Sequence, residues 1–313
     1  MTEKIATREA YGKALVELGK SNGNVVVLDA DLSKSTKTAL FAKEFPERFF
    51  DMGIAEQNMI GTAAGLAQGG KIPFASSFAV FATGRAFEQV RNSVCYPKVN
   101  VKIAATHAGV TVGEDGGSHQ SIEDIAIMRV LPNMTVIVPA DAEEAKQAVF
   151  HAAETEGPFY IRLGRSGVPV IHGGQYRFQL GKAEVMKQGK DAAVVACGLM
   201  VAEALAAADM LAADGIDIEV INSATIKPLD GKTIAAAAEK TGAVVTAEEH
   251  SIIGGLGSAV SELLGECCPV PVERVGVTDK FGESGAPGEL LEHFGLTADE
   301  IAKAVKRVLK RKA

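Results

Sequence analysis

The residues Asp51–Ser76, DMGIAEQNMIGTAAGLAQGGKIPFAS, contain one expected helix and one expected strand. Apolar side chains recur at helical spacing after Glu56, and no proline interrupts them before Gln68, so the pattern predicts a helix that begins near Glu56. The short apolar run 72–76 that follows predicts a buried strand. A long helix directly before a short buried strand is typical of a parallel sheet covered by helices.

The same alternation extends in both directions along the chain. Further helices are expected at 7–20, 78–94, 121–130 and 142–153, with strands at 24–28, 48–52, 99–106, 135–138 and 159–163. The pattern restarts with strands at 192–197, 216–221, 243–247 and 270–275 and helices at 201–213, 231–240, 256–264 and from 299. We therefore expect an α/β protein with two doubly wound domains, a mostly parallel first domain and a smaller second one.

The boundary between the two domains is expected in the stretch Gly164–Gly181, GRSGVPVIHGGQYRFQLG. It is rich in glycine and shows no sustained period, which is typical of a linker. We place the first domain at 1–170, the linker at 171–184 and the second domain at 185–313. The basic end of the chain, KRVLKRKA, is expected to be the solvated end of the last helix, and we assign it no function.

Composition limits the possible partners. The net charge of −7 over 313 residues argues against a general binder of nucleic acids or anionic membranes, and no apolar run approaches the length of a membrane span. The N-terminus lacks the apolar core of a signal peptide. The four cysteines show neither a disulfide framework nor zinc-ligand spacing, which fits reduced thiols. We expect a cytoplasmic protein.

Glu56 is a single charge in an otherwise apolar helix. It could be an ordinary first-turn glutamate that interacts favourably with the helix dipole. Because the helix has few polar residues, we expect most of its surface to be buried, and a buried carboxyl group must find a donor or accept a raised pKa. Both conditions are common in catalytic sites, so Glu56 is a candidate. Gly61 and Gly65 indicate that another backbone packs closely against this helix.

Polar and aromatic residues follow the expected strands of the first domain where each strand ends. In chain order they are Asp31, Ser35, Glu56, Phe78, His107 and the loop 113–120, GEDGGSHQ. Because ligands bind parallel sheets beyond the carboxyl ends of the strands, these residues are expected to lie together. The loop could be a surface turn, but His107 and His119 on either side of it can exchange hydrogen bonds with hydroxyl groups near neutral pH.

Three further features of the sequence limit the kinds of site that we expect. Phe78 and Phe81 have the spacing of a buried helix face, although they could form a wall for a flat ring. The glycines of Gly254–Gly257 lack the spacing of a nucleotide-binding loop and indicate close backbone packing. No pattern of metal ligands is present in the sequence.

Six separate motifs, in order, resemble the C-terminal half of transketolases, which consists of a pyrimidine-binding domain and a C-terminal domain. They are ADLSKST (30–36), DMGIAEQN (51–58), SSFAVFATGRAFEQVRNS (76–93), ATHAGVTVGEDGGSHQSIED (105–124), LPNMTVIVPAD (131–141) and YIRLGRS (160–166). THAG and GEDGxxHQ distinguish the chain from two similar families, the β subunits of 2-oxo-acid dehydrogenases and 1-deoxyxylulose-5-phosphate synthase.

The resemblance also identifies what the chain lacks. Transketolases hold the diphosphate of thiamine diphosphate and its divalent metal with a GDG motif followed by an asparagine pair, and this sequence has no such motif. The resemblance therefore implies the second subunit of a split transketolase. An N-terminal subunit would carry the diphosphate-binding domain and hold Mg or Ca, and we expect a hetero-oligomer with two copies of each chain.

The resemblance assigns roles to individual residues. Glu56 matches the glutamate that hydrogen-bonds N1′ of the pyrimidine of thiamine diphosphate, with a catalytic role. The other cofactor-binding positions are Phe81, which stacks on the pyrimidine, Phe78 beside it, and Asp31. The substrate-binding positions are Arg8, Ser35, His107, Asp115, His119 and Arg165, of which His107 and His119 are also expected to be catalytic. Gly84 departs from some transketolases, which have a tyrosine there, so the cofactor wall is expected to differ.

The activity implied by the resemblance is transfer of a two-carbon ketol unit from a ketose phosphate to an aldose phosphate. One alternative is a β subunit of a 2-oxo-acid dehydrogenase, although the hydroxyl- and phosphate-binding residues disfavour it. The other is a regulatory paralogue without activity, which the retention of Glu56, Phe81, Asp115 and His119 disfavours.

Overall fold

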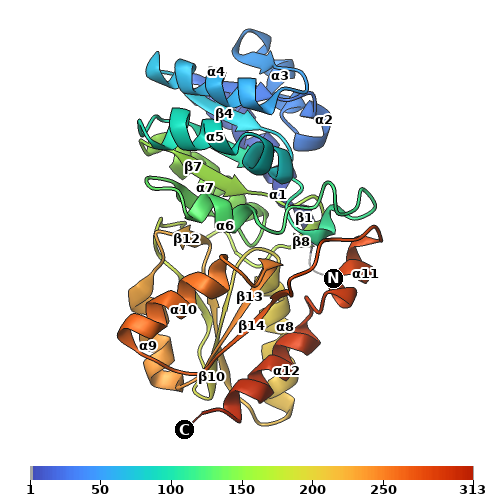
Figure 1. The fold of residues 1–313 in the computed structure, drawn as a ribbon, viewed down its shortest axis with the longest axis vertical. Helices are drawn as coiled ribbons and strands as arrows, with labels where there is room; N and C mark the ends of the chain where they lie inside the picture. Colours follow the sequence, from blue (N-terminus) through green and yellow to red (C-terminus); the bar gives the residue numbers. More distant parts are fainter. Residues whose placement is uncertain (1–2, 313) are drawn as a thin grey trace.

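The computed structural model describes residues 3–312, and its strands form two large sheets and one small one (Figure 1). The larger sheet has the order β12 (Thr225–Lys227), β6 (Thr135–Ile137), β7 (Phe159–Arg162), β5 (Lys102–Ala105), β4 (Ile72–Ser76), β2 (Val25–Asp29) and β3 (Phe49–Asp51). All its neighbours are parallel except β12, which pairs antiparallel with β6. We call the part of the chain up to β7, which supplies every strand of this sheet except β12, the N-terminal unit.

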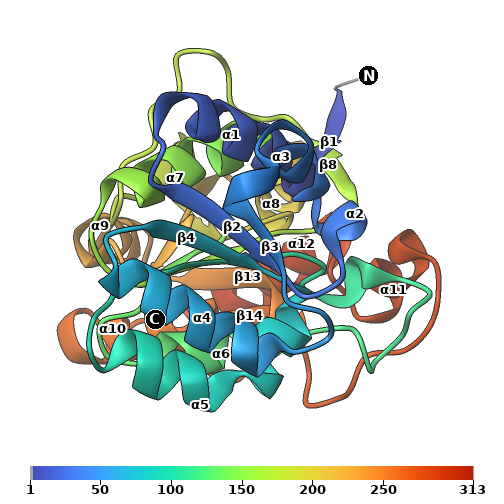
Figure 2. The same ribbon diagram turned by 90° about the horizontal axis from the view of Figure 1, so that it is seen from above.

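Helices cover both faces of the larger sheet, as predicted. Figure 2 shows α1 (Thr7–Ser21) and α7 (Ala142–Glu154) on one side and α4 (Glu56–Gln68), α5 (Phe87–Gln89) and α6 (Asp124–Arg129) on the other. The short helices α2 (Ser33–Thr36) and α3 (Ala39–Glu44) and the turn η1 (Pro46–Arg48) connect β2 to β3. The predicted doubly wound, mostly parallel architecture is confirmed for this unit.

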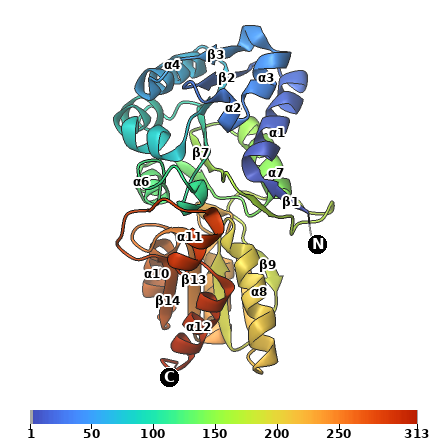
Figure 3. The ribbon, with the colours of Figure 1, turned by 90° about the vertical axis from the view of Figure 1, so that its right-hand side faces the viewer.

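The smaller sheet forms the C-terminal unit. Its order is β14 (Val272–Val277), β13 (Val244–Ser251), β10 (Ala192–Ala196), β11 (Ile218–Asn222) and β9 (Glu184–Lys187), with β9 antiparallel. Figure 3 shows the unit below the N-terminal one, with α8 (Met200–Ala213) and α12 (Ala298–Leu309) near each other. The other helices are α9 (Gly231–Thr241), α10 (Leu256–Cys267) and α11 (Pro287–His293).

Helix α4 begins at Glu56, as predicted, because Met59, Ile60, Ala63 and Ala64 form a buried face. The expectation that most of its surface is buried is wrong. Among the residues of the opposite face, Gln57, Asn58, Gly61 and Gly65 are exposed. A Cβ atom added at either glycine would meet no atom within 4 Å in the described part of the chain. The close backbone packing that we expected at Gly61 and Gly65 is therefore not found.

Two other predicted helices differ in detail. The segment expected as one helix at 78–94 is helical, but π-helical turns, η2 (Val80–Arg85) and η3 (Val90–Cys95), flank α5. Helix α6 begins at Asp124 rather than Ser121, because Ser121 forms a bridge with Ala108. This bridge ties the end of the 113–120 loop to the strand end at β5.

The expected linker is fastened to the N-terminal unit at several points. Strand β8 (Gly167–Pro169) pairs antiparallel with β1 (Lys4–Ala6). Further on, the backbone N–H groups of Ile171 and His172 both donate to Asp141 Oδ2, each at 2.8 Å. Our domain boundaries stay a prediction, but this stretch is not a free connection.

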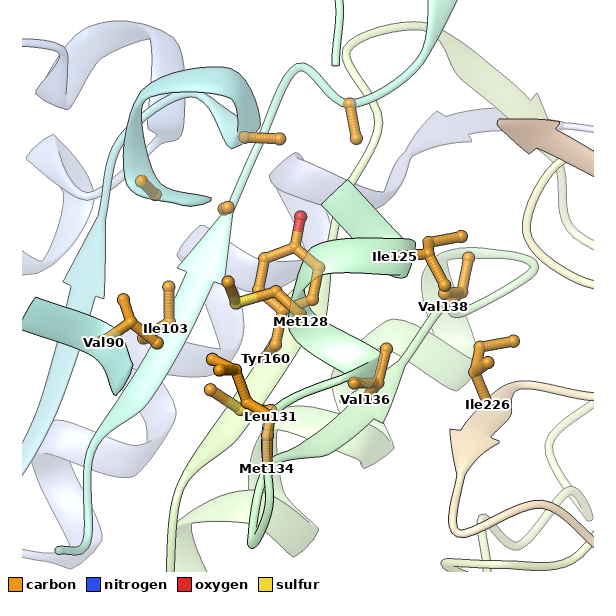
Figure 4. Close-up of a cluster of buried hydrophobic side chains, with 14 of the residues drawn as sticks. Val90, Ile103, Ile125, Met128, Leu131, Met134, Val136, Val138, Tyr160 and Ile226 are labelled. Carbon is orange, nitrogen blue, oxygen red and sulfur yellow. The ribbon is translucent and has the colours of Figure 1, made fainter. Parts of the chain in front are cut away.

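The two units share one hydrophobic core. Strand β12 follows β11 in the chain yet pairs with β6 of the other unit, and its Ile226 is buried beside Val136 and Val138 (Figure 4). Lys227 on the same strand donates to the carbonyl oxygens of Arg129 at 2.9 Å and Leu131 at 2.6 Å. A strand supplied by one unit thus completes the sheet of the other.

A buried ion pair lies at the same junction. Arg162 Nε donates to Asp124 Oδ2 at 2.7 Å and Nη2 donates to Oδ1 at 3.1 Å, while Tyr160 donates to the same carboxylate at 2.6 Å. Arg162 Nη2 also donates at 2.9 Å to the carbonyl oxygen of Glu249, in the C-terminal unit. The pair is almost fully buried and joins the two units.

The glycines before α10 pack closely, as predicted. A Cβ atom on Gly254 would lie 2.6 Å from that of Ala126, and one on Gly257 would lie 2.8 Å from Thr246 Oγ1. The N–H groups of Leu256 and Gly257 donate to the buried carboxylate of Glu248 at 2.7 Å. These N–H groups therefore bind a residue of the protein itself.

All four cysteines are free. Within residues 3–312, no helix combines the length and apolar character that crossing a membrane requires.

Candidate functional site

Glu56 lies at the start of α4, beyond the carboxyl end of β3, and only 1% of it is exposed. Its Oε2 accepts from Arg85 Nη1 at 2.8 Å, and its Oε1 accepts from Ser77 Oγ at 3.4 Å. Arg85 is half exposed, and its Cζ atom lies 4.5 Å from the ring centroid of Phe81. Glu56 is thus both a first-turn residue and a buried carboxylate, and Arg85 joins it to an aromatic ring.

Four rings gather beyond the ends of β4 and β5. Phe78 and His107 are stacked with centroids 3.8 Å apart, and Phe81 lies parallel to Phe78 at 6.1 Å. His119 presents its edge to Phe81 at 5.4 Å and to Phe78 at 6.3 Å. Phe78 is in the core, whereas Phe81 is only partly buried. The structure therefore brings the two predicted phenylalanines and the two predicted histidines together.

The ionisation of His107 follows from its neighbours. Burial, followed by the positive charges of Arg8 and Arg165, lowers the pKa of His107 to about 3. Arg8 Nη1 lies 3.4 Å from His107 Nε2, and because a guanidinium group only donates, Nε2 must accept. Nδ1 then carries the proton and donates to Thr106 Oγ1 at 2.8 Å. A neutral His107 is not an acid near neutral pH, and the single lone pair on Nε2 can accept from a hydroxyl group only in place of the 3.4 Å contact with Arg8.

Two arginines make this region positive. Arg8, in the first turn of α1, donates to the carbonyl oxygen of Ser35 at 2.8 Å. Arg165 follows β7 and donates to the carbonyl oxygen of Val112 and to Glu114 Oε2, the latter at 3.1 Å. Burial and the charge of Arg165 lower the pKa of Arg8, so the two like charges are near enough to interact. Such a pair favours an anionic group as its ligand.

Two predicted residues have no such surroundings. Asp31 is exposed in a left-handed conformation with φ of 62°, and its backbone N–H donates to Asp51 Oδ1 at 3.2 Å. Asp115 is exposed at the tip of its loop. Within residues 3–312, neither carboxylate takes part in a side-chain hydrogen bond or ion pair. Their assigned roles stay predictions.

Of the two donors to Glu56, Ser77 directly follows the expected strand 72–76, whereas Arg85 was not singled out. Arg85 lies inside the quoted motif SSFAVFATGRAFEQVRNS, directly after the exposed Gly84, and an arginine four residues after Phe81 on a helical segment was the available signal. Because Gly84 has no side chain, the guanidinium group of Arg85 forms part of the site surface beside Glu56.

The site fits the pyrimidine of thiamine diphosphate, the cofactor that the resemblance implies. A carboxylate has about four acceptor positions, and Glu56 uses one at 2.8 Å and one at a long 3.4 Å, so it can accept a further hydrogen bond. Phe81, whose ring lies under the Arg85 guanidinium, is only partly buried. In the part of the chain that the structure describes, no group of three or more His, Cys, Asp or Glu residues is placed to hold a metal ion.

Comparisons with known proteins agree with this geometry. Residues 3–170 match the transketolase pyrimidine-binding domain, and residues 181–301 match the transketolase C-terminal domain. A solved structure titled "Split gene transketolase, inactive beta4 tetramer" is 63% identical, with a TM-score of 0.93 over 99% of this chain and 100% of that one.

Curated relatives give the same result. The chain is 48% identical to a 6-deoxy-6-sulfo-D-fructose transketolase subunit of a Clostridium species, covering 97% of this chain and 95% of that protein. It is 40% identical to human transketolase over 98% of its own length, but it spans only 49% of that protein. A protein of Methanocaldococcus jannaschii, named as a transketolase C-terminal section, is 52% identical over 97% of this chain and 96% of its own length. The chain therefore belongs to the transketolase family, of which it comprises the pyrimidine-binding and C-terminal domains.

Proposed function

We propose that the chain is the C-terminal subunit of a two-chain transketolase that moves a two-carbon ketol unit from a ketose phosphate to an aldose phosphate. The observation that carries this proposal is the buried carboxylate of Glu56, which has unused acceptor capacity and is joined through Arg85 to the ring of Phe81. Thiamine diphosphate, when bound, supplies the carbanion-stabilising chemistry that such a transfer requires. Glu56 would hold a proton at the pyrimidine N1′ and so act as the acid–base group of this subunit.

The remaining residues would bind the sugar. Arg8 and Arg165, with Ser35, would hold the anionic end of the substrate, because their charges lie close enough to interact. Neutral His107 would accept a hydrogen bond from a sugar hydroxyl, and His119 and Asp115 would contact the same chain of hydroxyls. Phe78, Phe81 and Asp31 would bound the cofactor.

A separate N-terminal subunit would hold the diphosphate and its Mg or Ca ion. Two observations support this: the sequence lacks the GDG motif, and the similar split-gene protein is described as inactive when only β chains assemble. The exposed face of α4, next to Glu56, leaves room for a second chain there. We keep two copies of each chain as the expected stoichiometry.

The direct test combines this chain with a transketolase N-terminal subunit that carries GDG, thiamine diphosphate and magnesium. Ketol transfer from xylulose 5-phosphate to ribose 5-phosphate should appear only when both chains are present. Sizing of the chain alone and of the mixture gives the stoichiometry. Absence of transfer from the mixture, or full activity of this chain alone, contradicts the proposal.

Replacing Arg165 tests the anion site. Arg165→Ala should raise the KM for phosphorylated acceptors about tenfold or more, because it removes a charge-assisted contact, and should change the KM for unphosphorylated aldoses much less. A 6-sulfo sugar donor tests whether the site accepts a sulfonate, as the name of the clostridial relative suggests.

Arg177→Ala is the matched control for this prediction. Arg177 is an arginine that also donates to backbone carbonyl oxygens, those of Gly174 and Tyr176, but in the expected linker. It should leave both KM values unchanged. Equal changes for phosphorylated and unphosphorylated acceptors in Arg165→Ala would show that Arg165 does not bind the anionic group.

A further inference from the structure

The segment 278–287 of the C-terminal unit lies directly against the loop 113–120 of the N-terminal unit. It leaves β14 and leads into α11, and Figures 1 and 2 show α11 beside the loop that follows β5. Ser284 Oγ donates to the carbonyl oxygen of Glu114 at 2.6 Å. A Cβ atom on Gly113 would lie 3.2 Å from the ring of Pro287. The contact therefore includes Gly113, the first residue of the loop, as well as Glu114.

Gln120 joins the two segments from inside. Its side chain is buried, and Nε2 donates to the carbonyl oxygen of Glu283 at 2.8 Å. The same amide donates within its own unit to the carbonyl oxygens of Val110 at 3.1 Å and Gly113 at 3.4 Å. All three partners are backbone carbonyl oxygens, so one buried amide joins the loop 113–120 to segment 278–287.

Glycines make this approach possible. A Cβ atom on Gly117 would lie 2.5 Å from the carbonyl oxygen of Gly282, and one on Gly282 would collide with Oε1 of Gln120. A side chain at position 117 would have to move the backbone of the other segment, and one at position 282 would have to displace the amide of Gln120. The two backbones therefore meet at Gly117 and Gly282.

We infer that segment 278–287 positions the substrate loop 113–120, so that the C-terminal unit determines sugar affinity. The loop holds His119 against Phe81 through the bond from His119 N–H to the carbonyl oxygen of Gly116, at 3.0 Å. Displacing Gln120 moves the turn that orients His119 and Asp115. Gln120, Gly282 and Ser284 are positioning residues in this scheme, and their link to sugar binding rests on the proposed function.

The test uses two substitutions with matched controls. Gly282→Ala places a methyl group against Gln120, whereas Gly288→Ala, in α11, adds one where no described atom lies within 4 Å. Ser284→Ala removes the hydroxyl that bonds Glu114, whereas Ser261→Ala removes one that bonds Gly257 within α10 at 2.7 Å. The serine pair keeps the test decisive if Gly282→Ala does not fold.

Two measurements are made on each variant. Amide hydrogen exchange of residues 113–120 in the full chain should be faster in Gly282→Ala and Ser284→Ala than in their controls. In the two-chain complex, the KM for the sugar acceptor should rise about tenfold in Gly282→Ala, with kcat within a few-fold of wild type and an unchanged affinity for thiamine diphosphate.

Exchange rates and KM values equal to those of the controls would overturn the inference. A loss of kcat with no change in KM would also overturn it, because the loop would then act on the reaction and not on sugar binding. If the wild-type complex transfers no ketol unit, the proposed function fails, and the exchange data still decide whether the segment positions the loop.

Discussion

Glu56→Gln should lower ketol transfer by the reconstituted complex about 10²–10⁴-fold, which is the range that a positioned acid–base group contributes. The substitution keeps the shape of the side chain and an oxygen that can accept from Arg85. It removes the group that can share a proton with a ring nitrogen. Arg85 is half exposed, so the loss of its ion pair should have little effect on folding. Steady-state kinetics of the complex, with thermal unfolding of the variant, provides the measurement.

Glu88→Gln is the control for this substitution. Glu88 is exposed on α5 and accepts from Gln89 at 2.9 Å and from Asn92, both on the surface. It should behave as wild type. If Glu56→Gln kept activity within a few-fold of wild type while assembling normally, Glu56 would not be the acid–base residue.

Asp124→Ala should lower the free energy of unfolding by about 3–5 kcal/mol, the usual effect of removing one partner of a buried ion pair. The remaining Arg162 is nearly fully buried and would lose both of its charged contacts, keeping only bonds to the carbonyl oxygens of Ser121 and Glu249. Urea unfolding of the chain, with the midpoint and the slope measured for each variant, gives the change.

Two comparisons sharpen the test. Asp299→Ala removes an exposed carboxylate that pairs with Lys303, and it should leave the urea midpoint unchanged. Replacing both buried partners, as Asp124→Leu with Arg162→Met, should recover much of the lost stability. A single Asp124→Ala variant as stable as wild type would mean that the pair does not stabilise the junction.

The stability from this pair should also depend on pH. Burial raises the pKa of Asp124, but the charge and hydrogen bonds of Arg162 outweigh it and hold the pKa below its usual value of 3.8. The contribution of the pair to the free energy of unfolding is therefore complete above the pKa of Asp124 in the unfolded chain. It is lost as the pH falls through the pKa of Asp124 in the folded protein.

Much of the fold could be predicted because its elements are local patterns. Strand β4 was predicted with its observed bounds, and α4 and α7 within one residue, because their apolar spacing and flanking glycines act over a few residues. Strands β1, β8, β9 and β12 were missed. They are short and antiparallel, and their partners lie far away in the chain, so no local period marks them.

The open face of α4 shows a different limit. Glycine and alanine fit a tightly packed face and an exposed one equally well, and Gly61 and Gly65 gave no direction to the expected packing. The sequence shows that the helix has few polar residues, but it does not show which face of the helix contacts a partner.

The site was predictable where strand ends defined it. Phe78, His107 and Glu56 follow parallel strands of one sheet, so the topology alone places them at one edge. Ser77 also follows β4 directly and was predictable in this way. Arg85 and the segment 278–287 were not, because they depend on how a π-helical turn and the second unit approach the edge. His107 was expected as a catalytic residue, and its lowered pKa keeps the ring neutral, so it is not an acid near neutral pH.

Strand β12 has a consequence for the history of this chain. A recombination event that exchanged the C-terminal part of one relative for that of another would also exchange the strand that closes the β6 edge, together with Ile226 and Lys227. The incoming C-terminal part would have to pack against Val136 and Val138. It would also have to donate to the carbonyl groups at the end of α6 for the chimera to fold. The two parts are therefore expected to be inherited together, and a viable chimera needs its crossover placed so that β6 and β12 come from the same parent.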